Sequence, residues 1–596
     1  MGVQLSRVED LPNNKLLLRL ASPEKISIDD QFWNDLLLFE RRPFTYKEDE
    51  IIFEKCKNMC TMFAANNLKS GNFASMINVF LDNNSRLVSP ATNLATLTIL
   101  SQNALLIIRN YLRHLIHKYP ESEIIRQFEA PGNDLSDKSE SNDSIMAQFI
   151  NMVIDTIVHV PLTSNSYNLH VECVRTLLTI LSISQFTVEN SSLLKSYQII
   201  YENKQGEKLL LILVQRINQR RPEEDQSGGS IILHIADFLG LLSSASENDG
   251  SPLARSSVLL LTVLINHFSE GNNIYRNVLS NIADDLDKLF NSICMALNRE
   301  ETTLLLYYLL HRNPHFRNYV LTEADITSLV VPMLQTIYRA SDNNCHHMYM
   351  SLIILLILTE DNIFNKKIHT IMIKNLSWYT DRSLTEISLG GLIILVTTRT
   401  VQYNLLKMRD EYLHTNCLAA LANMSSQFTH LHSYVCQRII GLFEVLAKTY
   451  NRANQELVAI ERALRIILEV LNSCLSNQLI HNPNLIYTLL YKKEIFQSFR
   501  NNPAFHDIIH NLDEVVQYFT SKLDLEGDNC NDVDTVSMVI INASHHWPIH
   551  RLQKFPELKF KYVEEDKPEE FFVPYVWSLV CEHSNIYWQS SLFKQH

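Results

Sequence analysis

The first residues of the chain carry a pattern for covalent lipid attachment. Met1 is followed by Gly2, and Ser6 stands four positions further on. After removal of Met1, an N-terminal glycine with a serine at this spacing fits the substrate pattern of N-myristoylation. A single myristoyl chain gives only marginal, reversible membrane binding. The sequence therefore predicts that Gly2 is a lipidation site that anchors the chain weakly; the alternative is an unmodified N-terminus.

The residues near Gly2 supply no second membrane signal. No cysteine precedes Cys56, so palmitoylation close to Gly2 has no acceptor. The basic residues of the first 28 positions are offset by acidic ones, with Arg7, Lys15, Arg19 and Lys25 set against Glu9, Asp10 and Glu24. Stable anchoring takes two signals, so we expect the second to come from a partner protein or from the folded surface.

Cysteine and histidine gather at two other places, Cys345-His346-His347 and His545-His546. A zinc site needs about four ligands in paired spacing, and no partner pair stands out in the sequence for either cluster. We therefore expect polar residues at helix ends in both places, and no metal site.

Four more residues could do chemistry, but none has an evident partner. Cys56 and Cys60 are four positions apart, which places them on one face of a predicted helix, and two buried thiols explain this spacing. His414 and Glu386 stand in apolar contexts that we interpret as helical. No phosphate-binding glycine loop, nucleophile elbow or HExxH helix occurs in the sequence. We predict no catalytic residue, no cofactor and no small-molecule substrate; the chain is not expected to be an enzyme.

The composition favours helices and argues against a nucleic-acid partner. Only 13 of the 596 residues are glycine and 17 are proline; many-stranded sheets need glycine-rich turns, so the shortage favours helices with short connections. The formal net charge of −13 is opposite to what nucleic-acid binding needs. The ten cysteines are scattered, and no secretory signal opens the chain, so we expect a reduced, intracellular compartment.

Changes in composition divide the chain into six predicted segments. They are an irregular tail with the lipidation site over residues 1–28, an N-terminal helical region over 29–128, an acidic serine-rich linker over 129–144, a middle helical region over 145–253 with flexible loops near 220–230 and 243–252, a helical-repeat region over 254–550, and an extended aromatic segment over 551–596. The strongest apolar run, residues 352–358, is far shorter than the roughly 20 residues of a membrane span. Membrane contact is therefore expected to be peripheral.

An internal repeat predicts the architecture of the second half of the chain. Leu310 is followed six residues later by Phe316 across a polar turn, and Leu358 and Phe364 repeat this pattern 48 residues further on. Leu490 and Phe496 have the same spacing. A period in the forties is typical of HEAT and armadillo repeats. The expected fold is all-α, an elongated HEAT- or armadillo-like helical-repeat solenoid.

The C-terminal segment combines alternation with dense aromatic residues. Residues 555–565 alternate in a way that predicts an extended chain, and Phe571, Phe572, Tyr575 and Trp577 follow. If exposed, these four form an apolar patch of the kind that marks a partner site. Alternatively they fold back onto the last helices as a cap, which solenoid ends require. The sequence leaves both uses open.

Several blocks of the sequence resemble the dymeclin family. The blocks are residues 352–360, 374–379, 384–390, 412–425, 481–485 and 555–579, with weaker similarity at Met1-Gly2 and Phe32-Trp33-Asn34. The resemblance implies a peripheral protein of the cytosolic face of the Golgi that cycles with the cytoplasm, is needed for Golgi organisation and vesicle trafficking, and is N-myristoylated at Gly2. It implies Golgi-associated protein partners and no catalytic residues. The alternative hypothesis is a soluble armadillo- or HEAT-like adaptor or carrier without a lipid anchor.

Overall fold

The computed structural model describes residues 8–39, 45–88, 94–130, 144–187, 191–219, 251–267, 272–339, 345–374, 376–452, 458–526 and 532–589. These residues form two compact units. Unit 1 comprises Met1–Leu305 and Glu565–His596, and unit 2 comprises Leu306–Glu564. The described residues are overwhelmingly helical, which confirms the predicted all-α fold.

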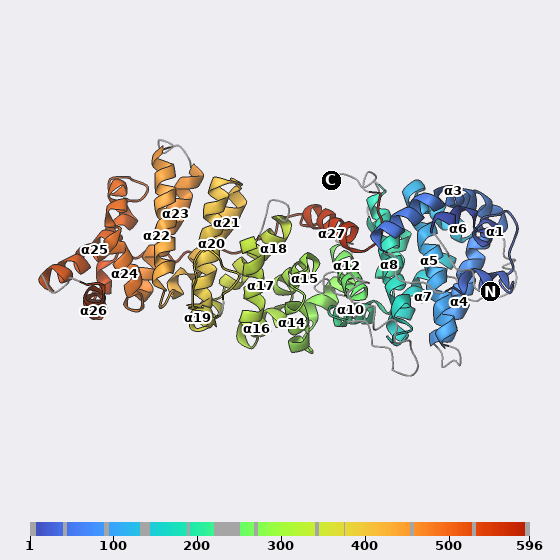
Figure 1. Cartoon of the computed structure of the whole chain (residues 1–596), viewed down its shortest axis with the longest axis horizontal. Helices are drawn as coiled ribbons and strands as arrows, with labels where there is room; N and C mark the ends of the chain where they lie inside the picture. Colours follow the sequence, from blue (N-terminus) through green and yellow to red (C-terminus); the bar gives the residue numbers. More distant parts are fainter. Residues whose placement is uncertain are drawn as a thin grey trace. The chain divides into compact units, whose positions relative to one another are not determined.

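Unit 1 is built around long helices that pack against neighbours both near and distant along the chain. Helix α5 packs against α3, α4 and α8, while α7 packs against α4 and α8, and α12 packs against α8 (Figure 1). The elements of this unit are η1 (Val8–Asn13), α1 (Lys15–Leu20), α2 (Phe32–Leu37), α3 (Tyr46–Ser70), α4 (Asn72–Val88), α5 (Leu94–Lys118), α6 (Glu121–Phe128), α7 (Ile145–His159), α8 (Tyr167–Leu181), η2 (Ser182–Gln185), η3 (Ser191–Leu193), α9 (Lys195–Tyr201), α10 (Gly206–Gln215), α12 (Pro252–Asn266), α13 (Ile274–Asn281), α14 (Leu286–Cys294) and α27 (Glu569–His583). The division between the units falls within α15 (Glu300–Arg312).

The turn between α3 and α4 shows how local sequence fixes this packing. Thr45 and Glu48 form a capping box that begins α3. Gly71 ends the helix in the left-handed region with φ of 67°, which glycine adopts without strain. The buried side chain of Asn72 then accepts a hydrogen bond from the N–H of Ile26 and donates to the carbonyls of Leu20 and Glu24. The N-terminal residues are thereby tied to the α3–α4 turn.

Unit 2 is a two-row helical array. Helices α18, α21, α23 and α25 form one row and α17, α20, α22 and α24 the other, each helix packing against its row neighbour and against one helix of the opposite row. The elements are α16 (Pro314–Thr322), α17 (Ile326–Arg339), α18 (Cys345–Thr359), α19 (Asn362–Thr370), β1 (Met372–Lys374), β2 (Glu386–Ser388), α20 (Leu389–Leu406), α21 (Glu411–Met424), η4 (Ser425–Gln427), α22 (Ser433–Arg452), α23 (Val458–Gln478), η5 (Leu479–His481), α24 (Pro483–Tyr491), η6 (Lys493–Phe499), α25 (His506–Glu526), α26 (Val533–Ser544) and η8 (Ile549–Arg551). This stacking confirms the predicted helical-repeat fold.

The repeated leucine–phenylalanine spacing marks the helix ends of this array, as predicted. Leu310 lies in α15, Asn313 caps α16 by accepting the N–H of Phe316, and Phe316 is buried. At the second copy Asp361 caps α19, and Phe364 is buried. The third copy differs, because Phe496 returns to the core from the 3-10 helix η6.

Three details differ from the sequence-based expectations. Glu386 lies on β2, which pairs antiparallel with β1, and not in a helix. The tail over residues 1–28 was expected to be irregular, but its described part contains η1 and α1. The segment over 551–596 was expected to be extended, but residues 569–583 form α27, because Glu569 and Glu570 begin a helix whose apolar face becomes buried.

The six segments expected from composition stay a prediction. The division into compact units falls at Leu305, because α12 packs with α8 and α10 and α13 packs with α10. The linker residues 131–143 and the loop residues 220–230 and 243–250 lie outside the described residues. Among the described residues no single helix has the length and apolarity of a membrane span, although two bent pairs meet the criterion together by length and composition, α16 with α17 and α18 with α19.

Candidate functional site

Gly2 lies outside the described residues, which begin at Val8. The elements that follow it are well packed: Leu11 of η1 and Leu20 of α1 are buried, and Asn14 caps α1 by accepting the N–H groups of Leu16 and Leu17 at 2.9 and 3.1 Å. The first described residue is thus six positions from the proposed acylation site. The lipidation of Gly2 therefore stays a prediction. The first described elements that follow Gly2 in the sequence, η1 and α1, belong to unit 1.

The four aromatic residues predicted as a partner surface lie on α27. Phe571 is 46% exposed, whereas Phe572, Tyr575 and Trp577 are buried. The Tyr575 hydroxyl donates to Glu300 Oε1 at 2.6 Å, and Trp577 Nε1 donates to His267 Nε2 at 2.8 Å. Three of the four side chains are thus packed within the protein, and the partner surface stays a prediction.

This packing takes place in unit 1 and not on the last helices of the repeat region. Helix α27 packs against α12, and His267 is the C-cap of α12. Burial lowers the pKa of His267 to about 3, so its ring is neutral and Nε2 can accept the indole N–H. Of the four aromatic side chains, only Phe571 remains available at the surface of unit 1.

A buried cluster of charges binds the chain after α27. The N–H of Tyr587 donates to Asp49 Oδ2 at 2.8 Å, and its carbonyl accepts from Arg113 NH1 at 3.0 Å. Asp49 pairs with Arg113 and, at 3.4 Å, with Arg109, whose Nε pairs with Glu172 at 3.0 Å. Burial alone would raise the pKa of Asp49, but the two guanidinium groups and the Tyr587 N–H outweigh it and hold the pKa at about 2. A charged Asp49 thus links α3, α5 and the C-terminal end.

In unit 2 the chain between residues 553 and 564 is an irregular segment that we call the C-terminal strap. Its side chains alternate in exposure: Leu558, Phe560, Tyr562 and Glu564 are half-buried, whereas the residues between them are exposed. A period of two is typical of an extended chain. The exposure of the side chains thus alternates as the sequence does, which supports an extended strap.

Two asparagine side chains hold the main chain of the strap. On α25, Asn511 Nδ2 donates to the carbonyl of Gln553 and its Oδ1 accepts the N–H of Gln553, both at 2.8 Å. On α21, Asn423 makes the same pair of bonds to Phe560, at 2.9 and 2.7 Å. A side-chain amide carries both a donor and an acceptor, so it satisfies both main-chain groups of one residue. This mode of binding does not depend on the strap's own side chains at these two positions.

At the end of the strap, the side chain of Glu564 is bound as well as the main chain. Glu360 accepts the N–H of Tyr562 at 2.9 Å. Glu564 accepts from the Tyr307 hydroxyl at 2.8 Å and pairs with Arg312 at 3.2 Å, and His311 Nε2 lies 3.7 Å away. Partial burial would raise the pKa of Glu564, but these three groups outweigh it and hold the pKa at about 2. Groups on α25, on α21, directly after α18 and on α15 thus bond to the strap at residues 553, 560, 562 and 564.

The reactive residues noted in the sequence lie apart from one another. Cys56 and Cys60 are buried on α3 as predicted, and burial raises the pKa of Cys56 to about 11, so its thiol stays protonated. Cys345 begins α18, and His545 directly follows α26, as expected for helix-end residues. Within the described ranges, no group of three or more His, Cys, Asp and Glu side chains is placed to hold a metal ion.

His414 and Glu386 also have structural surroundings. His414 is buried, and its Nδ1 lies 3.1 Å from the side-chain amide of Asn404. Glu386 is paired with Lys374 across the two-stranded sheet at 3.7 Å. Among the described residues, His414 thus has an amide and Glu386 a lysine as its partner.

The sequence interpretation missed Asn423, Asn511 and the charges around Asp49. Asn423 stands within an alanine- and leucine-rich run, and a polar residue in such a run needs a hydrogen-bond partner. That signal indicates a buried asparagine, but it does not identify a strap 137 residues further along the chain. Asp49 gives no comparable signal, because it lies in a polar first helical turn.

These features define a class: an all-α helical-repeat protein whose C-terminal segment is built into both of its units. The comparisons then give the family. The family described as "Dymeclin: Dyggve-Melchior-Clausen syndrome protein" matches residues 1–579. The chain is 37% identical to Dymeclin of Drosophila melanogaster over 691 residues, covering 100% of this chain and 99% of that protein. It is 38% identical to Dymeclin of Gallus gallus over 657 residues, covering 99% and 98%. The chain belongs to the dymeclin family.

A more distant relative matches part of the chain. Human Protein HID1 is 24% identical over 222 residues, which cover 35% of this chain and 26% of that protein. The name of the dymeclin family denotes no enzymatic activity.

Proposed function

We propose that this chain is a non-catalytic scaffold needed for Golgi organisation and intracellular vesicle trafficking, attached reversibly to the cytosolic face of Golgi membranes by N-myristoylation of Gly2. The observation that carries the proposal is the family match over residues 1–579, which includes Gly2 and Ser6. The partners are then Golgi-associated proteins, which the helical array would bind through its surface.

The chemistry of the anchor supports a reversible association. One myristoyl chain holds a protein on a membrane only marginally, with an association constant of about 10⁴ M⁻¹. Arg19 is paired with Glu24 and Asp30 at 3.3 and 3.2 Å, so its charge is balanced within the fold. With a weak lipid and balanced local charge, the protein divides between membrane and cytosol, and protein partners decide where it stays.

The test compares Gly2→Ala with wild type in cells. Mass spectrometry of the N-terminal peptide is expected to find myristoyl on wild type and none on the variant. Fractionation is expected to move Gly2→Ala towards the cytosol, and proximity labelling from the intact chain is expected to lose Golgi proteins. Val3→Ala is the matched control, because it leaves both Gly2 and Ser6 in place. An unmodified or merely acetylated wild-type N-terminus would remove the lipid step.

A second candidate function is a soluble adaptor or carrier without a lipid anchor. One observation favours it: unit 2 already binds an extended segment through Asn423 and Asn511, so its helical array has groups suited to extended peptides. This candidate predicts an unmodified Gly2 and a uniform cytosolic distribution, which the same mass spectrometry and fractionation would detect.

A further inference from the structure

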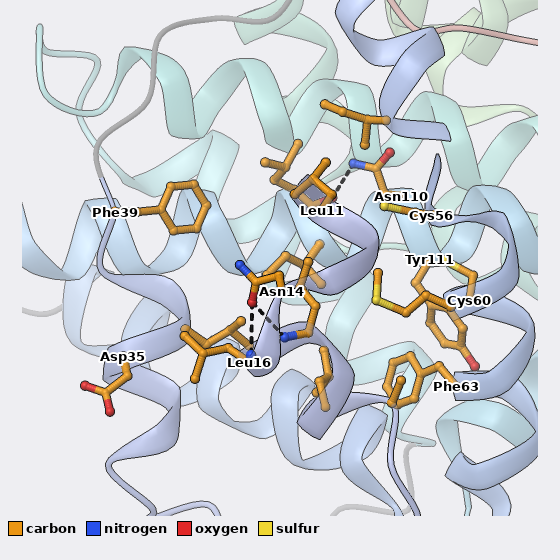
Figure 2. A pocket seen from close by; sticks show the side chains of 18 residues that line it. Leu11, Asn14, Leu16, Asp35, Phe39, Cys56, Cys60, Phe63, Asn110 and Tyr111 are labelled. Atoms are coloured by element: carbon orange, nitrogen blue, oxygen red, sulfur yellow. Dashed lines mark hydrogen bonds between the residues drawn. The ribbon is translucent and has the colours of Figure 1, made fainter. Parts of the chain in front are cut away.

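An apolar pocket of about 140 Å³ lies in unit 1 beside the N-terminal elements (Figure 2). Its walls come from five elements, η1, α1, α2, α3 and α5. The lining is dominated by aliphatic and aromatic side chains, among them Leu11, Leu36, Ile52, Phe63 and Leu106. Apolar cavities of about this size bind apolar ligands, and this pocket is partly open, so it is suited to a hydrocarbon group that enters from outside.

Most polar groups of the wall side chains are already hydrogen-bonded within the fold. Asn14 Oδ1 caps α1, Asn110 donates to the carbonyl of Leu106 and accepts from Arg113, and the Tyr111 hydroxyl donates to Gln127. Asp35 is exposed, and its carboxylate points away from the other labelled side chains (Figure 2). The occupant of the pocket is therefore apolar.

The thiols of the wall are protonated and therefore unreactive at neutral pH. Burial raises the pKa values of both Cys56 and Cys60, so neither is a thiolate at neutral pH. Both thiols then act as small apolar groups. This chemistry fits a hydrocarbon chain that is held without reaction.

The myristoyl group proposed for Gly2 would supply a hydrocarbon chain close to this pocket. Leu11 forms part of the wall, and it stands nine positions after Gly2. Nine residues span at most about 30 Å, so an acyl group on Gly2 can reach the pocket that its own η1 helps to form. Asn72 ties Leu20, Glu24 and Ile26 to the α3–α4 turn, which fixes the wall contributed by α1.

We propose that this pocket binds part of the myristoyl chain on Gly2 in the cytosolic form of the protein, an inference that rests on the acylation of Gly2 proposed above. A cavity of about 150 Å³ holds a ligand the size of benzene, so the pocket takes a portion of the chain and not its full length. Because one myristoyl chain binds membranes only marginally, a competing site inside the protein shifts the balance towards the cytosol.

The first test compares acylated wild type with the unacylated full-length chain by hydrogen exchange and thermal melting. Acylation is expected to protect η1, α1 and the facing turns of α3 and α5, and to raise the melting temperature. Equal exchange and equal melting with and without acyl would overturn the proposal. Protection that rises with protein concentration would assign the pocket to a second copy and would also overturn the proposal.

A second test fills the pocket. Met59 is half-buried and lines the pocket from α3, so Met59→Trp is expected to exclude the acyl chain. Met62 lies on the same helix, is 38% exposed and does not line the pocket, so Met62→Trp is the matched control. Acylated Met59→Trp is expected to bind phosphatidylcholine–phosphatidylserine vesicles several-fold better than wild type, whereas Met62→Trp is expected to bind as wild type does. Mass spectrometry of each protein separates the two proposals: missing acylation contradicts the lipid anchor, and full acylation with unchanged vesicle binding contradicts the pocket.

Discussion

In unit 1 helix α27 is held by its buried side chains, whereas in unit 2 two asparagines hold the main chain of the strap. Trp577 and Tyr575 are buried and each donates one hydrogen bond to a partner in unit 1. In unit 2, Asn423 and Asn511 bind both the N–H and the carbonyl of one strap residue each. The side-chain contacts specify which residue stands at each position, whereas the main-chain contacts specify only that the chain is extended.

The energies that correspond to these two modes differ. Removing a large buried side chain, or one partner of a buried ion pair, destabilises a protein by several kcal/mol. Removing an asparagine side chain that binds the main chain leaves one N–H and one carbonyl of the strap without partners. The loss of stability is about 1–3 kcal/mol for each group that stays buried, and less for a group that water reaches. Substitutions in unit 1 are therefore expected to release the C-terminal end more readily than substitutions in unit 2 release the strap.

The largest effect is expected for Asp49→Ala. The substitution leaves Arg109 and Arg113 buried with less compensating charge and removes the acceptor of the Tyr587 N–H. Breaking a buried pair from one side costs about 3–5 kcal/mol. Calorimetry is expected to show a lower melting temperature, and hydrogen exchange is expected to show faster exchange after α27. Asp82→Ala is the control, because Asp82 and its partner Arg86 are both more than half exposed. Equal losses for the two variants would show that the Asp49 cluster is not important for stability.

A loss of similar size is expected for Trp577→Ala. The indole ring is 1% exposed, and truncation of a buried tryptophan costs about 3–5 kcal/mol. The buried Nε2 of His267 also loses its donor. Phe571→Ala on the same helix is the control, and its exposed ring is expected to change stability by less than about 0.5 kcal/mol. If Phe571→Ala were the more harmful in a melting experiment, the assignment of buried and exposed faces on α27 would be wrong.

A smaller effect is expected for Asn423→Ala, which tests the main-chain mode in unit 2. Loss of the amide removes both bonds to Phe560, and the expected destabilisation is about 1–3 kcal/mol. Hydrogen exchange of the strap is expected to accelerate near Phe560. Asn416→Ala on the same helix is the control, because Asn416 bonds only within its own helix, to the carbonyl of Tyr412. Unchanged exchange near Phe560 would mean that the strap does not depend on Asn423.

The sequence is informative about structure where a pattern is local. Helix ends at Asn313 and Asp361 follow from capping residues beside apolar runs, and the extended strap follows from its alternation. Contacts between distant residues leave no such pattern. Asp49 and Tyr587 are 538 positions apart, and nothing in either neighbourhood indicates the other. The aromatic residues of α27 show the same limit: density of aromatic rings predicts burial against something, but it does not say whether that is a partner protein or the chain's own α12.

The smallest effect is expected where unit 2 uses a charge, at Glu564. Its pKa of about 2 lies below its ordinary value of 4.5, because bonds from His311 and Tyr307 and the charge of Arg312 outweigh the effect of partial burial. A carboxylate whose pKa is lowered by folding stabilises the fold fully above its ordinary pKa, and this contribution is lost as the pH falls towards the folded value. Because Glu564 is partly exposed to solvent, Glu564→Gln is expected to cost at most about 1 kcal/mol at neutral pH.

The difference in melting temperature between wild type and Glu564→Gln is therefore expected to be constant above the ordinary pKa and to shrink between pH 4.5 and about 2. Glu565→Gln, at the exposed next position, is the control at neutral pH. A difference that stays constant down to the acid limit would show that the charge of Glu564 does not hold the strap, and that unit 2 retains it through its other bonds, those of Asn423 and Asn511 among them.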